Sequence, residues 1–177
     1  MKFLTELLPG CFLIQPTKLE DRRGYFVKTY HEELFTQRGI NMKIREEFYS
    51  VSRKDVLRGM HFQLPPHACE KLVFCPQGAV RDVLLDLRSG AGYGKVASTE
   101  LSGENGNIVF IPKGVAHGFI SLRDQSLMMY KTSEVHCPTC DCGIHWDSFG
   151  FDWGINQPCL SDRDQKHDFF NNFKTRF

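Results

Sequence analysis

The stretch that decides the fold reads Gly106-Asn107-Ile108-Val109-Phe110-Ile111-Pro112-Lys113-Gly114-Val115-Ala116-His117. An apolar run typical of a buried strand ends at Pro112. Gly114 allows a tight turn because it carries no Cβ. A second β-type run follows the turn, and it is expected to aim His117 into the mouth of a barrel.

Short β-type runs of the same kind fill most of the chain, and turn residues such as those at 76–78, 89–92 and 102–103 separate them. Only residues 31–38, which Gly39 ends, and a segment near the C-terminus capped by Ser161 are expected to be helical. This pattern predicts an all-β fold, a cupin-type jelly-roll β-barrel with a few short helices, including one near the C-terminus. The predicted strands are 12–15, 25–30, 44–51, 57–63, 71–76, 79–87, 95–101, 107–111, 117–122 and 126–133.

Length and composition exclude several classes of protein. The 177 residues suit a single domain, 1–177, and a net charge of +1 gives no electrostatic footprint for nucleic acid. No apolar run approaches the roughly 20 residues that a membrane span needs. Glu6 and Pro9 interrupt the N-terminus too early for a secretory signal. We therefore expect a cytoplasmic protein that binds neither nucleic acid nor membrane.

A metal in the barrel is not expected. Metal-binding cupins supply a His-x-His pair and a carboxylate from their first motif, whereas this chain reads His61-Phe62-Gln63. His61 and His117 without a suitably placed carboxylate make a poor site for zinc or iron. The sequence thus predicts neither a metal nor any other cofactor in the barrel.

The cysteines form a cluster that invites a second interpretation. Cys137, Cys140 and Cys142 lie between His136 and His145, a spacing that resembles a zinc site. A structural zinc needs four ligands in tetrahedral closure. The odd total of seven cysteines favours free thiols, and both interpretations stay open.

Two side-chain directions also stay open. Lys71 begins a strand and either extends to solvent, the commoner outcome, or enters the barrel. Asp82 and Asp86 share one face of the strand that begins at residue 79, and that face is either the solvent side or a polar lumen.

Taken together, a set of motifs in order resembles the dTDP-4-dehydrorhamnose 3,5-epimerase family over nearly the whole chain. Each motif alone is weak, but the set is highly specific. The motifs are Asp21-Arg22-Arg23-Gly24, Val56-Leu57-Arg58-Gly59-Met60-His61-Phe62-Gln63, Lys71-Leu72-Val73, Asp82 through Arg88, Ile111-Pro112-Lys113-Gly114-Val115-Ala116-His117-Gly118-Phe119, Tyr130-Lys131 and Leu160-Ser161-Asp162-Arg163-Asp164.

The resemblance implies an isomerase that inverts C3, or C3 and C5, of a nucleotide-linked 4-keto-6-deoxyhexose in deoxysugar biosynthesis. It implies four catalytic residues: His61 as the base, Asp164 as its partner carboxylate, Lys71 beside the enolate oxygen and Tyr130 as the acid on the opposite face. Inversion beside a ketone requires these chemical roles.

Further residues are implied to bind the substrate. Arg23 and Arg58 match residues that hold the pyrophosphate, which suits a guanidinium fork. His117 is implied to line the pocket, and Gln63 shares the strand face of His61. The resemblance also implies a homodimer in which the N-terminal strands cross to the neighbour and place Arg23 near its site.

The chain departs from the family pattern at Lys28, Glu46, Phe48 and Val135-His136. Several of these positions are implied to lie near the nucleotide base or the sugar. A CDP-sugar therefore stands beside a dTDP-sugar as the substrate, and inversion at C3 alone is slightly favoured.

Two other functions remain as alternatives. A ketoisomerase or dehydratase of nucleotide sugars would begin with the same proton abstraction. A non-catalytic sugar-nucleotide binding cupin is also compatible with the fold. The joint presence of His61, Lys71, Tyr130 and Asp164 argues against a binding protein, which needs no opposed base and acid.

Overall fold

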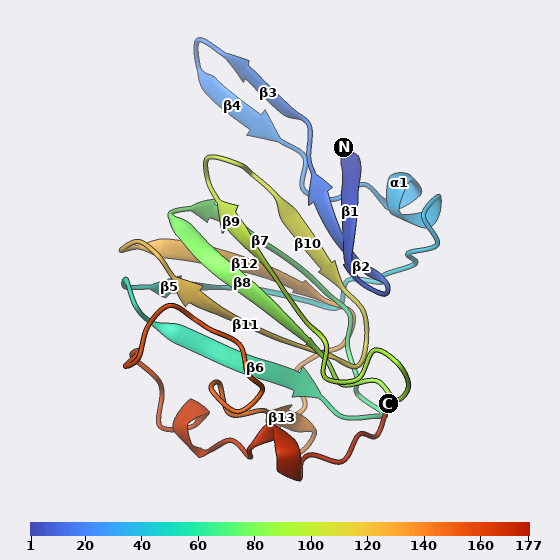
Figure 1. Ribbon diagram of the computed structural model, residues 1–177. Helices are drawn as coiled ribbons and strands as arrows, with labels where there is room; N and C mark the ends of the chain where they lie inside the picture. The colour runs from blue at the N-terminus through green and yellow to red at the C-terminus, as the bar shows by residue number, and fades with distance from the viewer.

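The computed structural model describes residues 1–177 and consists of two antiparallel sheets that face each other (Figure 1). The six-stranded sheet has the order β1 (Lys2–Leu8), β2 (Cys11–Gln15), β10 (Ile108–Ile111), β7 (Lys71–Gln77), β12 (Ser126–Thr132) and β5 (Glu46–Ser52). The five-stranded sheet has the order β13 (Asp141–Gly143), β6 (Leu57–Gln63), β11 (Val115–Ser121), β8 (Ala79–Asp86) and β9 (Val96–Ser102). The predicted cupin-type jelly roll is confirmed.

The main core lies between the two sheets because alternate residues of each strand point inward. Val80 and Leu84 of β8 belong to this core, whereas Val83 and Leu85 face outward. Asp82 shares the inward face and is completely buried. The two acids of β8 therefore face the lumen and not the solvent.

The outer faces of both sheets are covered by chain segments. Helix α1 (Glu32–Thr36) buries Phe35 against the six-stranded sheet. The C-terminal part of the chain packs Trp153, Phe173 and Phe177 over the five-stranded sheet. This segment contains the short 3-10 helices η1 (Asp164–Lys166) and η2 (Phe170–Asn172).

Some predicted elements differ from the structure. The strand predicted for 25–30 is β4 (Gly24–Val27), and the helix predicted for 31–38 spans only Glu32–Thr36. The helical segment near the C-terminus is two 3-10 turns, and Ser161 Oγ accepts a hydrogen bond from the Asp164 amide at 3.1 Å. Sequence analysis missed β1, β3 (Lys18–Asp21) and β13. These strands lie at sheet edges or in a free hairpin, where one-sided burial leaves no clear alternation.

Strands β6 and β11 approach each other closely at two glycines. A Cβ on Gly118 would lie 2.7 Å from the Met60 sulfur and 2.9 Å from the Arg58 carbonyl oxygen. Gly59 occupies the facing position with φ of +132°. This approach joins the strands that carry His61 and His117.

Gly118→Ala is expected to lower the free energy of unfolding by about 1–3 kcal/mol, since the added methyl group overpacks a backbone contact. Urea unfolding monitored by circular dichroism would measure the change. A loss below about 0.5 kcal/mol, the range of neutral surface substitutions, would contradict the steric argument.

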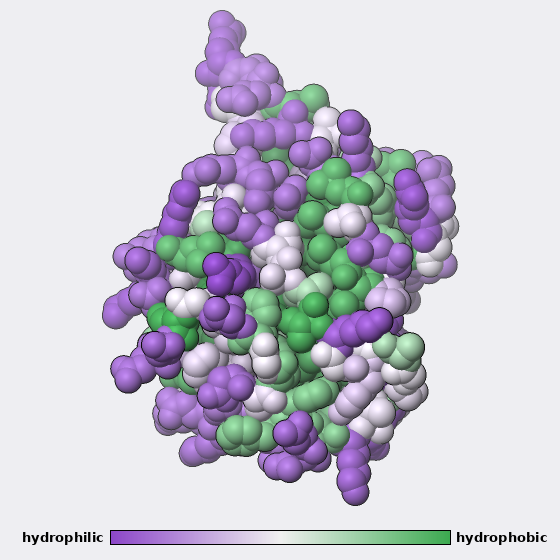
Figure 2. Space-filling model, viewed as in Figure 1, coloured by the Kyte–Doolittle hydropathy of each residue, from purple (hydrophilic) through white to green (hydrophobic).

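A two-stranded hairpin of β3 and β4 stands clear of the sandwich (Figure 1). Its residues are almost all exposed, including Leu19, Tyr25 and Phe26. Figure 2 shows a hydrophilic tip on this projection and uncovered apolar residues on the face of the molecule below it. The helices are all short, and none of them is a candidate membrane span.

Candidate active site

A cavity of about 480 Å³ opens between the two sheets. Its volume lies in the range typical of small-molecule sites. Side chains of both sheets and of the C-terminal segment line it, and they are mostly polar. The lining residues that sequence analysis singled out are Glu46, Phe48, Arg58, His61, Gln63, Lys71, His117, Tyr130 and Asp164.

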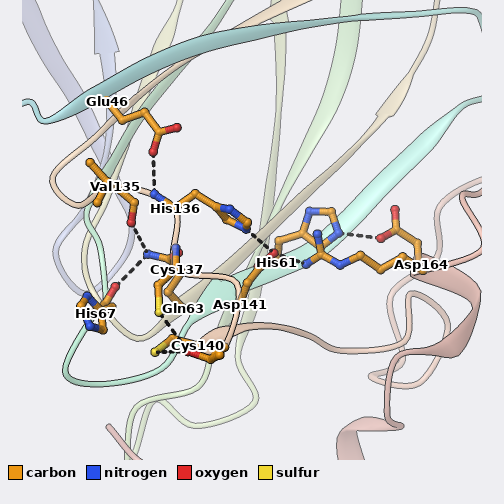
Figure 3. Close-up of polar contacts among 12 residues, drawn as sticks. Glu46, His61, Gln63, His67, Val135, His136, Cys137, Cys140, Asp141 and Asp164 are labelled. Atoms are coloured by element: carbon orange, nitrogen blue, oxygen red, sulfur yellow. Dashed lines mark hydrogen bonds and ion pairs between the residues drawn. The ribbon is translucent and has the colours of Figure 1, made fainter.

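His61 and Asp164 form a hydrogen-bonded pair in this cavity. His61 Nε2 lies 2.6 Å from Asp164 Oδ1, and the Gly59 amide donates to the other carboxylate oxygen at 3.4 Å. Asp164 comes from η1, so the C-terminal segment delivers the partner of a β6 histidine. Figure 3 shows the imidazole and the carboxylate directed toward each other.

The environment holds His61 neutral and Asp164 ionised. Burial lowers the pKa of His61 and outweighs the opposing effect of Asp164. Burial raises the pKa of Asp164, but hydrogen bonds from His167 and His61 together hold it well below its usual value. Because an ionised carboxylate accepts the Nε2 proton, the free lone pair of His61 is on Nδ1. The pair is thus poised to accept a proton.

A second imidazole–carboxylate pair lies beside the first. His117 on β11 is directly opposite His61 on β6, and His117 Nε2 is 2.6 Å from Asp82 Oδ1. Both members are almost completely buried. The pair fixes His117 as a polar wall of the cavity.

Lys71 enters the barrel and does not extend to solvent. Its Nζ donates to the His61 carbonyl oxygen at 3.0 Å, and burial lowers its pKa. An amine in this position is next to the His61 backbone and within the cavity lining.

Tyr130 lies on the opposite sheet from His61. It is on β12 and is 9% exposed, and burial raises the pKa of its phenol well above the ordinary value. Its ring stacks on that of Phe48, with centroids 4.7 Å apart and planes 14° apart. The base candidate and the acid candidate therefore approach the cavity from different sheets.

The remaining cavity residues have distinct partners. Arg58 Nε donates to Ser52 Oγ at 3.0 Å. Glu46 accepts a hydrogen bond from the His136 amide at 2.7 Å. The amide group of Gln63 is fully engaged by the backbone of neighbouring loops.

Two predicted substrate-binding residues are not brought to the cavity of their own chain. Arg23 is at the tip of the β3–β4 hairpin, where it pairs only with Asp21. Lys28 follows β4 directly and does not line the cavity.

The residues at the position of the cupin metal do not fit a metal ion. Gln63 occupies the place of the second histidine of the first motif, and both atoms of its amide are engaged. His117 Nε2 is taken by Asp82. The 2.6 Å between His61 and Asp164 is a hydrogen bond, shorter than the spacing of two ligands on a tetrahedral metal.

Several residues in the cavity lining or directly behind it had no predicted role. Asp82 was noted without a role because its partner His117 lies 35 positions away. Arg163 pairs with Asp141 at 2.8 Å, and His167 Nε2 lies 3.3 Å from Asp164. The position of His167 three residues after Asp164 on a helical turn was a usable signal.

The cysteine cluster differs from the arrangement weighed in the sequence. His136 bonds to Asp141 and His145 to Asp147, and Cys142 packs against the outer core. These three do not join Cys137 and Cys140. His67 lies beside those two cysteines instead, and no sequence signal pointed to it.

Comparisons with known proteins agree on one family. The family model described as dTDP-4-dehydrorhamnose 3,5-epimerase matches residues 5–172. A dTDP-4-dehydrorhamnose 3,5-epimerase of Methanothermobacter thermautotrophicus is 37% identical over 171 residues, 93% of this chain and 91% of that protein. A dTDP-4-dehydrorhamnose 3-epimerase of Streptomyces niveus is 34% identical over 162 residues, 89% of this chain and 78% of that protein.

A solved structure agrees as well. The dTDP-6-deoxy-D-glucose-3,5-epimerase of Legionella pneumophila, in complex with dTDP-4-keto-L-rhamnose, superposes with a TM-score of 0.93. It is 30% identical, and the match covers 98% of this chain and 94% of that one.

Proposed function

Because the chain belongs to the dTDP-4-dehydrorhamnose 3,5-epimerase family, we propose that it inverts C3 and C5 of a dTDP-linked 4-keto-6-deoxyhexose. The departures at Lys28, Glu46 and Phe48 slightly favoured inversion at C3 alone and left a CDP-sugar open beside a dTDP-sugar. The relatives compared above are named as epimerases of dTDP-sugars. The family model and two of these three relatives are named 3,5-epimerase, and the third is named 3-epimerase. We adopt the dTDP substrate and inversion at both carbons.

The observation that carries this proposal is the opposition of His61 and Tyr130 across the cavity. The C4 ketone acidifies the protons at C3 and C5. His61 Nδ1 removes the proton from one face of the carbon, and the electron pair of the C–H bond moves to the C4 oxygen. Tyr130 then gives its proton to the carbon from the other face. Solvent restores both groups. Each proton transfer by a positioned group is typically worth about 10²–10⁴-fold in rate.

Lys71 supports the enolate in this scheme. Its Nζ lies in the cavity next to His61, where a low dielectric strengthens its attraction for the developing charge on the C4 oxygen. Arg58, at the end of the cavity where β5 meets β6, binds the pyrophosphate.

Proton exchange tests the proposal directly. The protein is incubated in deuterated water with the 4-keto-6-deoxyglucose nucleotide, once as dTDP and once as CDP, and the ring protons are followed by NMR. We expect deuterium at C3 and C5 and faster exchange of the dTDP-sugar. Deuterium at C3 alone would make the protein a 3-epimerase. No exchange from either substrate would overturn the proposal in favour of a binding protein. A product with a moved carbonyl group would indicate a ketoisomerase.

Asp164→Asn is expected to shift the pH profile as well as the rate. Asp164 stabilises the protonated imidazole, so its loss lowers the pKa of His61 further. Activity requires neutral His61, and the acid limb of log kcat/KM should therefore move to lower pH. We also expect a fall in kcat of about 10²-fold or more, since the tautomer is no longer fixed. An unchanged acid limb would contradict this role.

A homodimer completes the proposed site. The β3–β4 hairpin projects from the barrel with exposed apolar side chains, and it carries Arg23 and Lys28 away from their own cavity. A two-fold dimer is the commonest closed assembly. We place the hairpin on the neighbouring subunit, with its Arg23 at the pyrophosphate end of that subunit's cavity.

Mixed dimers test this arrangement. Arg23→Ala and His61→Asn homodimers should each be strongly impaired. Mixing them under subunit exchange should restore about a quarter of the wild-type activity, since half of the dimers then hold one intact site. No recovery despite proven exchange would place Arg23 in its own subunit's site. A monomer mass by light scattering would overturn the dimer.

A reducing compartment, the cytoplasm, suits the chemistry of this chain. All seven cysteines are unpaired, and one of them, Cys69, lines the catalytic cavity. We propose that the enzyme acts there. We expect the chain to lose activity when it is exported to an oxidising compartment. Full activity after export would contradict this argument for the cytoplasm.

A further inference from the structure

Two loops that lie outside the catalytic cavity bring together a histidine and two cysteines. His67 belongs to the loop between β6 and β7, and Cys137 and Cys140 belong to the loop between β12 and β13. Their ligand atoms all lie within 4.8 Å of one another. None of the three residues lines the cavity. Figure 3 shows them as a group, with His61 and Asp164 at the other end of the view.

The two loops are held together by backbone and Gln63 hydrogen bonds. Gln63 accepts from the Cys137 amide at 2.6 Å and donates to the His67 carbonyl oxygen at 2.9 Å. The Leu64 amide donates to the Cys140 carbonyl oxygen at 2.9 Å. None of these bonds uses the imidazole or either sulfur atom, and the sulfurs contact the Thr139 hydroxyl, at 3.4 Å from Cys137 Sγ and 3.9 Å from Cys140 Sγ.

Cys137 and Cys140 lie on one hydrogen-bonded turn. The amides of Cys140 and Asp141 both donate to the Cys137 carbonyl oxygen, at 3.0 and 2.9 Å, and so bring the two sulfurs to the same side of the turn. The C-x-x-C spacing is that of zinc sites. Sulfur ligands of tetrahedral zinc, at about 2.3 Å from the metal, lie about 3.8 Å apart, so small side-chain rotations suffice.

We propose that His67, Cys137 and Cys140 bind one Zn²⁺, with water in the fourth position. Two thiolates neutralise the ion, and the partly exposed edge of the cluster leaves room for solvent. The ion links the two loops and so fixes His136, the cavity-lining neighbour of Cys137. The site is separate from the epimerase residues, and with three protein ligands it is an open site and not the closed four-ligand type.

Cobalt substitution tests the site without reference to catalysis. The whole protein is purified with a non-thiol reductant, treated with a chelator and titrated with Co²⁺. We expect a thiolate-to-cobalt charge-transfer band and tetrahedral d–d absorption that saturate at one ion per chain and disappear when Zn²⁺ is added. Zn²⁺ should also raise the melting temperature, because it binds only the folded chain.

Matched variants identify the ligands. Cys137→Ser, Cys140→Ser and His67→Gln should each weaken Co²⁺ binding by at least about 100-fold, the upper range for loss of even an outer-shell partner. Cys142→Ser and His145→Gln should bind as the wild type does, because these side chains face the core and Asp147. Wild-type affinity in Cys137→Ser, or equal loss in Cys142→Ser, would overturn the assignment. So would a reduced protein that binds no Co²⁺ and forms a Cys137–Cys140 disulfide on oxidation. Epimerase activity, measured separately, should persist in the metal-free protein.

Discussion

His61→Asn should lower kcat for epimerisation by about 10²–10⁴-fold, the typical contribution of a general base. Asparagine keeps a polar side chain of similar shape near the backbone, but its amide nitrogen lies at about the place of Nδ1, so the hydrogen bond from Nε2 to Asp164 is lost as well. It has no group that accepts a proton from carbon at neutral pH. KM should therefore change little, while deuterium exchange at C3 and C5 should fall together with inversion.

The control for this variant is His145→Asn, which alters a histidine paired with Asp147 outside the cavity. Its exchange rate should equal that of the wild type. Exchange at the wild-type rate in His61→Asn would show that another group is the base, and His117 would then be the next candidate.

Tyr130→Phe should separate proton exchange from inversion. The variant keeps the stacked ring against Phe48 but loses the phenol that delivers a proton from the second sheet. His61 still removes a proton and returns a deuteron to the same face. We expect deuterium in the recovered substrate and a fall in inverted product of about 10²-fold or more.

Substrate and product must be quantified separately in this experiment, by NMR coupling constants as well as by deuterium content. If exchange and inversion fall by the same factor, Tyr130 assists the abstraction step and is not the opposed acid. If inversion persists, a solvent molecule or another side chain supplies the proton.

Sequence patterns were sufficient for the barrel and for the cavity residues that lie on its strands. The run 57–63 is a strand with the predicted bounds, and His61 and Gln63 face inward as strand parity requires. Parity alone did not decide whether Asp82 or Lys71 faced the lumen, because a strand has two faces and only the second sheet defines the inner one.

Contacts between distant loops were beyond the reach of sequence patterns. His67 lies 70 positions before Cys137, and only the crossing of two irregular loops brings them together. Arg23 shows the converse case, because its motif was recognised although the hairpin carries it away from the cavity of its own chain.

The origin of Asp164 has a consequence for how the protein fails on heating. The carboxylate that orients His61 is not part of either sheet but of the C-terminal segment, which is attached by aromatic packing and short hydrogen-bonded turns. Segments of this kind open with a smaller free energy than the strands they cover. Catalysis should therefore be lost on heating before the barrel melts, and the temperature of inactivation should follow the detachment of this segment.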